Sequence, residues 1–210
     1  MRLTVFGSTG RTGQEIVRQA LGRGYAVTAY ARNPQKIDFT HPHLTVVPGE
    51  LSDRNAMKVA VLGADCIISA LGPAGPVRDT ALSDGVGNML SAMGECDVSR
   101  LVLLSTISSP DSNDHGDLRS KLMVGMVKRS YPGNYAEIVR IGQLVSGSNI
   151  DWTLIRIPLL NDKPLSKKVR AGYLGHKAVG STISRADLAW FMLEQVESSE
   201  YSRRAPAVSN

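Results

Sequence analysis

The 210-residue sequence has few cysteines, few aromatic residues and no long hydrophobic run. Its two cysteines, Cys66 and Cys96, lie far apart and outside any Cys-x-x-Cys pattern, which argues against a disulfide framework. The histidines have no ligand-like spacing, so we expect no metal site. No apolar stretch approaches the roughly 20 residues that span a bilayer, and the first residues do not resemble a signal peptide. We therefore expect a cytoplasmic protein with no membrane partner.

The sequence also lacks a run of basic residues, although its formal net charge is +5 at pH 7. Proteins that bind nucleic acid usually carry blocks of lysine and arginine. Scattered basic residues favour anionic ligands such as phosphates, or they simply form a solvated surface. We expect no nucleic-acid partner, a small-molecule substrate, and a monomer or weak homodimer.

Short apolar runs of strand length alternate with segments of helical periodicity along the chain. This alternation is typical of an α/β protein with a doubly wound parallel sheet, the Rossmann fold. A chain of this length suits a single domain over residues 1–210, and the proline- and glycine-containing segment 158–210 is expected to contribute a small substrate lobe. The expected strands are 3–6, 26–31, 44–47, 64–71, 100–104 and 152–157, and the expected helices are 14–21, 56–62, 80–93, 118–127, 135–145 and 185–196.

Three glycines, Gly7, Gly10 and Gly13, separate the first expected strand from the first expected helix in GSTGRTG. Free N–H groups and the helix dipole make a helix N-terminus attractive to anions. Glycines there permit a tight turn, let a pyrophosphate approach the backbone, and allow the helix to pack closely on the strand. Donor side chains are interspersed with the glycines: Ser8, Thr9, Arg11 and Thr12. In this context the motif predicts a dinucleotide-binding site.

The end of the second expected strand distinguishes NAD from NADP. A carboxylate there binds the ribose 2′-hydroxyl of NAD, whereas an arginine accommodates the 2′-phosphate of NADP. The sequence AYARNPQK has Arg32 at that place, with Lys36 nearby. It therefore favours NADPH as the cofactor, the alternative being that Arg32 is an ordinary surface charge.

The order of several segments resembles the atypical short-chain dehydrogenase/reductases, a family of NAD(P)H-binding proteins. The likeness is greatest to its NADPH-dependent flavin reductases of the biliverdin reductase B type, and the family also has NmrA-like members. The glycine motif is common to the wider superfamily, so the collinear order of the segments is the more specific feature. The matching segments cover nearly the whole chain: GSTGRTG, PGELSD, ADCIISALG, RLVLLST, DWTLIRIPLLNDKP and ISRADLAWFMLEQVESSEY.

The resemblance implies a set of cofactor-binding residues along the carboxyl ends of the strands. The residues implied at the pyrophosphate and the adjacent ribose are Gly7, Thr9, Gly10, Arg11 and Thr12, with Gly13 completing the turn. Those implied at the 2′-phosphate are Arg32 and Lys36, and those beside the adenine are Glu50 and Leu51. The residues implied under the ribose and phosphates are Ala70, Leu71 and Gly72. The residues implied around the nicotinamide are Ser105, Thr106, Pro158 and Leu159.

The catalytic region departs from the usual pattern. Many short-chain dehydrogenases carry Tyr-x-x-x-Lys, in which the lysine lowers the pKa of the tyrosine so that the phenol can exchange a proton. Here neither Tyr131 nor Tyr135 is followed by a lysine at that spacing. Thr106 stands where the flavin-reductase pattern has a serine, and Leu159 where it has a histidine. Threonine can still donate a hydrogen bond but leucine cannot move a proton, so alcohol oxidation by the usual mechanism is not expected.

The segment SSPDSNDHGDLRSK follows the fifth expected strand and should lie over the nicotinamide pocket. Its His115, or one of its carboxylates, could serve as a general acid or base. Alternatively its polar residues only form turns and cap the next helix. Asp162 and Lys163, after the last strand, are weaker candidates for the same role. The catalytic candidates are therefore Ser105, Thr106 and His115.

These observations favour an NADPH-dependent reductase that transfers hydride to a flavin, quinone or conjugated small molecule. Such acceptors delocalise the incoming charge and need little acid catalysis from the protein. Two alternatives stay open. The missing tyrosine–lysine pair would suit a cofactor-independent lyase or isomerase of a specialised metabolite. The intact glycine motif with an altered catalytic region would suit a non-catalytic, NAD(P)-sensing regulator of the NmrA-like kind.

Overall fold

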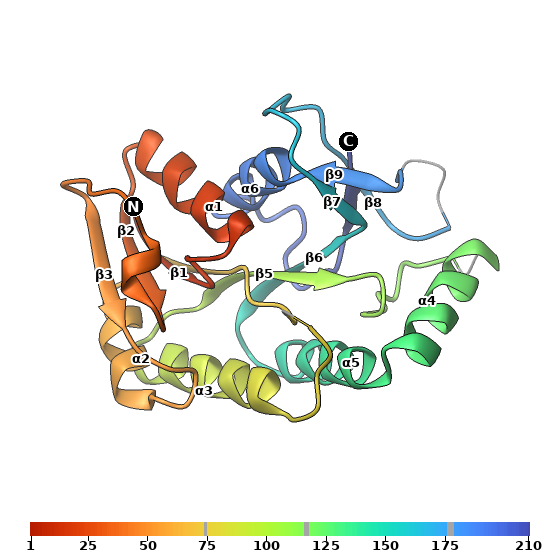
Figure 1. The fold of residues 1–210 in the computed structure, drawn as a ribbon, viewed down its shortest axis with the longest axis horizontal. Coiled ribbons are helices and arrows are strands. Elements are labelled where there is room, and N and C mark those ends of the chain that lie inside the picture. The colour runs from red at the N-terminus through yellow and green to blue at the C-terminus, as the bar shows by residue number, and fades with distance from the viewer. Residues whose placement is uncertain (74, 116–117, 176–178) are drawn as a thin grey trace.

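A computed structural model describes residues 1–73, 75–115, 118–175 and 179–210 and is built around an eight-stranded sheet (Figure 1). The strand order is β3-β2-β1-β4-β5-β6-β10-β8, and the pairs are parallel except for β10 with β8. The first six strands in this order reproduce the doubly wound arrangement, so the predicted fold class is confirmed. The bounds of all eight strands are β1 (Arg2–Phe6), β2 (Ala26–Ala31), β3 (Leu44–Pro48), β4 (Cys66–Ser69), β5 (Arg100–Thr106), β6 (Asp151–Ile157), β8 (Arg170–Gly172) and β10 (Ala207–Ser209).

Helices cover both faces of the sheet (Figure 1). On one face lie α1 (Arg11–Gly22) and α6 (Arg185–Glu194). On the other face lie α2 (Arg54–Val61), α3 (Ala81–Glu95) and α5 (Pro132–Ser146). Beside α5, α4 (Leu118–Ser130) extends beyond the end of the sheet, and a short 3₁₀ helix, η1 (Pro34–Lys36), follows β2.

The central strands are mostly apolar because both of their faces are buried. Leu3 and Val5 of β1 pack on the side of α1 and α6, whereas Phe6 packs on the side of α2 and α3. In β4, Ile67 and Ile68 divide between the same two cores. Successive side chains of a strand point to opposite faces, so a strand between two helix layers needs apolar residues at every position.

Residues 158–210 divide between the main sheet and a small rim. Strand β10 lies between β6 and β8 in the sheet, and α6 packs against α1. A separate pair of parallel strands, β7 (Leu159–Asn161) and β9 (Thr182–Ser184), forms what we call the β7–β9 rim. Helix α6 begins with a side-chain cap, because Ser184 Oγ accepts the N–H of Asp187 at 3.0 Å. That this rim binds a substrate stays a prediction.

Candidate cofactor site

The glycine turn follows β1, between β2 and β4, where the strand order reverses. Gly7 has φ +71°, a left-handed conformation, and a Cβ on it would lie 2.9 Å from the carbonyl carbon of Ala70. A Cβ on Gly13 would lie only 2.0 Å from the carbonyl oxygen of Gly7. Neither position can hold a side chain without a shift of backbone, so these two glycines allow the turn to pack closely against β4 and α1.

The N-terminus of α1 is available to a ligand. Gly10 is the N-cap residue, and among the described residues no side chain caps it and no acidic residue stands in the first turn. Such a terminus presents free N–H groups and a positive dipole end to an anion. The Ser8 hydroxyl donates to the carbonyl oxygen of Tyr30 at 2.9 Å, so this side chain fastens the turn to β2 rather than facing a ligand as expected. Thr12 is nearly buried, whereas Thr9 lines the adjoining pocket.

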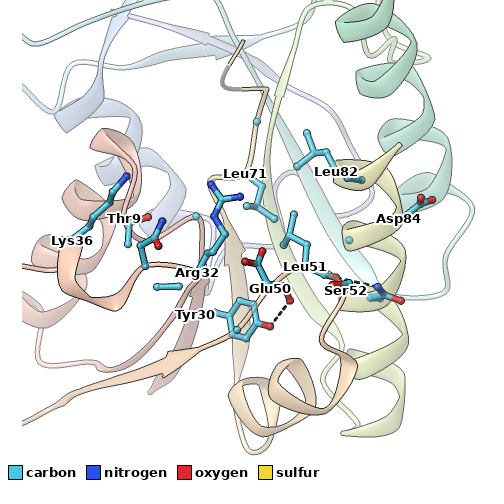
Figure 2. Close-up of a pocket in the computed structure, with 18 residues that line it drawn as sticks. Thr9, Tyr30, Arg32, Lys36, Glu50, Leu51, Ser52, Leu71, Leu82 and Asp84 are labelled. Carbon is cyan, nitrogen blue, oxygen red and sulfur yellow. Dashed lines mark hydrogen bonds between the residues drawn. The ribbon is translucent and has the colours of Figure 1, made fainter. Parts of the chain in front are cut away.

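A pocket of about 580 Å³ opens beside this turn, beyond the ends of β1, β2 and β3 and against α3 (Figure 2). Of the residues expected to bind a cofactor, those that line it are Gly7, Thr9, Arg32, Lys36, Glu50, Leu51, Leu71 and Gly72. Lining residues that were not expected include Tyr30, Asn33, Ser52, Leu82, Asp84 and Asn88. The pocket therefore gathers predicted residues from the loops after β1, β2, β3 and β4.

Apolar walls line the part of the pocket near α3. Leu51, Leu71 and Leu82 converge there from three different segments (Figure 2). The approach of the loop to the helix is close, since a Cβ on Gly85 would lie 2.7 Å from Cβ of Leu51. Asn88 donates from its side-chain amide to the carbonyl oxygen of Leu51 at 3.0 Å. These contacts hold an apolar surface on which a flat ring could pack.

Tyr30 supports the same wall from below. Its hydroxyl donates to the carbonyl oxygen of Glu50 at 2.7 Å (Figure 2). Burial, followed by the negative charges of Asp53 and Glu50, raises the pKa of Tyr30 to about 12, so the hydroxyl stays protonated at neutral pH. Gly49 is needed beside it, because a Cβ there would lie 2.2 Å from the tyrosine oxygen. The role of Tyr30 was missed, and the adjacent glycine in PGEL was the only sign of such a close approach.

Two positive side chains line the pocket without a carboxylate partner among the described residues. Arg32, just after β2, extends into the middle of the pocket, and Lys36 of η1 lies at its edge (Figure 2). Acidic side chains on the same lining are Glu50, from the loop after β3, and Asp84 of α3. Arg18 on α1, by contrast, is paired with Asp38 at 3.3 Å. The exposed pair Arg32 and Lys36 is thus a concentration of unneutralised charge next to an anion-binding turn.

Arg11, also expected at the pyrophosphate, does not line this pocket. Its guanidinium is hydrogen-bonded to Asp162, whose second oxygen binds Arg185 at 2.6 Å. Asp162 follows β7, so the pair links the glycine turn to the β7–β9 rim.

The catalytic candidates at the end of β5 differ in their accessibility. The Ser105 hydroxyl lies 2.8 Å from that of Ser109, and both residues are buried, which argues against contact of Ser105 with a bound acceptor. Thr106 is only half-buried, and its oxygen accepts the N–H of Ser108 at 3.3 Å, leaving its own hydrogen free to donate. Ile157 is the register partner of Thr106 on β6, so Pro158 and the exposed Leu159 follow directly beside it.

The loop after β5 is fastened to the body of the domain by its carboxylates. Asp114 forms two bonds, at 2.6 and 2.7 Å, with the fully buried guanidinium of Arg156. Asp111 accepts the N–H of Ala205 at 2.6 Å. The exposed His115 follows, and its N–H donates to the carbonyl oxygen of Leu174 at 2.9 Å. Residues 116 and 117 of the expected 107–117 loop lie outside the described residues, and whether the loop covers a ligand stays a prediction.

Two features are absent from the parts of the chain that the structure describes. No helix there is both long and apolar enough to cross a membrane. No group of three or more His, Cys, Asp or Glu side chains in these parts is placed to hold a metal ion.

Comparison with known proteins assigns the family. The profile of the NAD(P)H-binding family matches residues 7–199. An uncharacterized protein of Mycobacterium tuberculosis is 29% identical over 115 residues, covering 52% of this chain, and the match spans only 12% of that relative's length. Two solved structures are similar over 100% of this chain. A short-chain dehydrogenase/reductase from Veillonella parvula in complex with NADP has a TM-score of 0.78 at 17% identity and is 94% covered. The anaerobilin reductase ChuY from Escherichia coli O157:H7 has a TM-score of 0.78 at 17% identity and is 97% covered. The glycine turn, the pocket beside it and the match over residues 7–199 together show that the chain belongs to the NAD(P)H-binding family.

Proposed function

We propose that this protein is an NADPH-dependent reductase whose acceptor is a flavin, a quinone or another conjugated small molecule. The observation that carries the NADP preference is the unpaired Arg32 and Lys36 in a pocket that begins at the glycine turn. The NADP complex of the Veillonella relative and the reductase activity named for ChuY support the proposal by analogy.

The described residues fit such a cofactor. The open N-terminus of α1 would bind the pyrophosphate, because its N–H groups have no acidic side chain in the first turn. Arg32 and Lys36 would hold the 2′-phosphate, and the wall of Leu51, Leu71 and Leu82 would pack on the adenine. When bound, the cofactor supplies a hydride from its nicotinamide ring.

The acceptor side would be formed by the ends of β5 and β6. Leu159 is 71% exposed and offers an apolar surface beyond β6. The Thr106 hydroxyl retains a free hydrogen and can donate a hydrogen bond to an acceptor oxygen or nitrogen. Positioning of donor and acceptor would supply most of the rate enhancement, since a conjugated acceptor spreads the negative charge it receives. His115, on the loop after β5, remains a candidate proton donor.

A sensing role is the second candidate because α4 exposes an apolar stripe. Leu118, Leu122 and Met126 are 85%, 66% and 59% exposed and are spaced to share one helix face. A sensor would bind NADPH without turnover. The lyase or isomerase alternative is less favoured, because Asp111 and Asp114 are engaged in structural contacts rather than free for proton transfer.

The decisive experiment measures binding and turnover with three proteins: wild type, Arg32→Ala, and a surface control, Arg129→Ala on α4. NADPH and NADH are titrated by nucleotide fluorescence, and NADPH oxidation is followed with FMN and a soluble quinone. We expect NADPH to bind at least tenfold more weakly to Arg32→Ala, about 1.4 kcal/mol, with NADH affected much less and the control unchanged. Binding without oxidation of NADPH by any acceptor would favour the sensor. Equal affinity for both cofactors in all three proteins would contradict the NADP site.

A further inference from the structure

A second hollow, of about 230 Å³, lies beyond the glycine turn on the outer side of α1. Asp162 stands in it between two arginines, bonded to Arg11 and, at 2.6 Å, to Arg185. Arg185 is mostly buried, with 19% of its side chain exposed, whereas the side chains of Arg11 and Asp162 are 69% and 55% exposed. The link from Asp162 to Arg185 is therefore the better shielded of the two.

The backbone places this carboxylate near the positive ends of two helices. Arg11 is the first residue of α1 and Arg185 is the first residue of α6. N-terminal helix ends and arginines both attract anions, and Asp162 is the acidic side chain paired with both arginines. Arg11 belongs to the same turn whose N–H groups would receive a pyrophosphate. The pyrophosphate of the cofactor and the carboxylate of Asp162 would thus both be negatively charged partners for the Arg11 guanidinium.

We propose that Asp162 competes with the pyrophosphate of the cofactor for Arg11 and so lowers cofactor affinity. This inference rests on the proposed NADPH site. Moving Arg11 from Asp162 to the pyrophosphate costs little free energy, because exposed ion pairs contribute little to stability and are screened by water. The pyrophosphate carries two negative charges and lies at the helix N-terminus, so Arg11 turns to it while Asp162 remains on Arg185. Asp162 is then a residue that sets affinity without touching the cofactor.

The test compares Asp162→Asn with wild type and with a charge-matched control, Asp38→Asn. Asp38 is also an exposed partner of an arginine on α1, Arg18, but it lies outside the turn. We expect NADPH and NADH to bind about three- to tenfold more tightly to Asp162→Asn than to wild type. This range corresponds to the Coulomb repulsion between the Asp162 carboxylate and the two negative charges of the pyrophosphate across several ångströms of water. The gain should shrink at high salt and should be lost in the Arg11→Ala background. Adenosine 2′-monophosphate, which has no phosphate at its 5′ position, should bind wild type and Asp162→Asn alike.

The outcomes separate this inference from the proposed function. If adenosine 2′-monophosphate and NADPH bind, but Asp162→Asn binds NADPH no more tightly than wild type or than Asp38→Asn, competition by Asp162 is refuted and the NADP site stands. If neither nucleotide binds wild type, the proposed function itself fails. A gain that persists in the Arg11→Ala background would also overturn the inference, because it would reflect general charge rather than release of Arg11. Thermal unfolding of each variant checks that the fold is retained.

Discussion

Replacing Asp114 by alanine is expected to destabilise the fold by about 3–5 kcal/mol, because it leaves a buried charge without its partner. The Arg156 side chain is fully buried, and that of Asp114 is 16% exposed. Besides its two bonds to Asp114, the guanidinium donates to the carbonyl oxygen of Ser109 at 3.1 Å. Among the described residues its Nε has no hydrogen-bond partner. The variant would also remove the acceptor of the Leu174 N–H, at a cost of about 1 kcal/mol.

The assay is urea unfolding followed by the fluorescence of Trp152 and Trp190, with Asp38→Ala as a control of equal charge change. The control removes only an exposed partner and should change stability by less than about 1 kcal/mol. The informative variant is the double replacement of Asp114 by alanine and Arg156 by methionine. Since this removes both ends of the pair, we expect it to recover at least half of the loss.

Lowering the pH should also weaken the ion pair between Asp114 and Arg156. Burial raises the pKa of Asp114, but the bonds from Arg156 and from the N–H groups of Asp111 and Leu174 outweigh it, so the pKa lies below its usual value. The stabilisation is therefore complete above the unfolded pKa, about 3.9, and is lost as the pH falls through the lower folded value.

Two results would refute the assignment of Asp114 as the counterion of Arg156. One is a single variant, Asp114→Ala, that lowers the free energy of unfolding by less than about 1 kcal/mol. The other is a double variant no more stable than the single one.

Three further predictions follow from other buried contacts. Gly13→Ala should abolish NADPH binding or lower stability by several kcal/mol, because its Cβ would lie 2.0 Å from the oxygen of Gly7; nucleotide titration and thermal unfolding check this. Asp187→Asn should destabilise the protein at pH 7, and the loss should shrink as the pH falls below the unfolded pKa of about 3.9 and through the lower folded value. Burial raises the pKa of Asp187, but its hydrogen bonds to Ser166, Ser184 and Lys167 outweigh burial and lower it; urea titrations at pH 7 and at a series of acid pH values measure the difference. A thiol reagent at pH 8 should label Cys96 in the native protein and Cys66 only after unfolding, because burial raises the pKa of Cys66 to about 12.

The layout of the fold could be predicted because local pattern and tertiary environment agree. The expected strand 100–104 is apolar at positions 101–104, as suits a strand between two helix layers, and it forms part of β5, residues 100–106. Helix α6 begins at residue 185, as expected. Helix α5 begins at Pro132, three residues before the predicted start, because proline is well tolerated in the first turn. The bounds of β7, β8, β9 and β10 were not predicted, since runs of three residues leave too little periodicity to detect.

Much of the lining of the candidate cofactor pocket could also be predicted from the sequence. Gly7 and Gly13 shape the turn through backbone geometry, and Arg32 stands at the end of a strand, so residue type and position carry most of the information. Tyr30 and Asn88 were missed because each acts by a hydrogen bond to the backbone of the loop at 50–51. Such contacts depend on which segments the fold brings together, and nothing in either residue's local sequence indicates them.

The acceptor half depends on pairings between side chains that are distant in sequence, and this has a chemical consequence. Carboxylates are abundant in the loop after β5, which made proton transfer by that loop a reasonable hypothesis. In the fold, Asp114 neutralises the buried Arg156 and Asp111 holds the N–H of Ala205. A carboxylate with its pKa held below the usual range is ionised at neutral pH and is a poor proton donor. Excluding Asp114 as the donor leaves the Thr106 hydroxyl, His115 or solvent, which supports an acceptor that tolerates a slow or external protonation, as a flavin or quinone does.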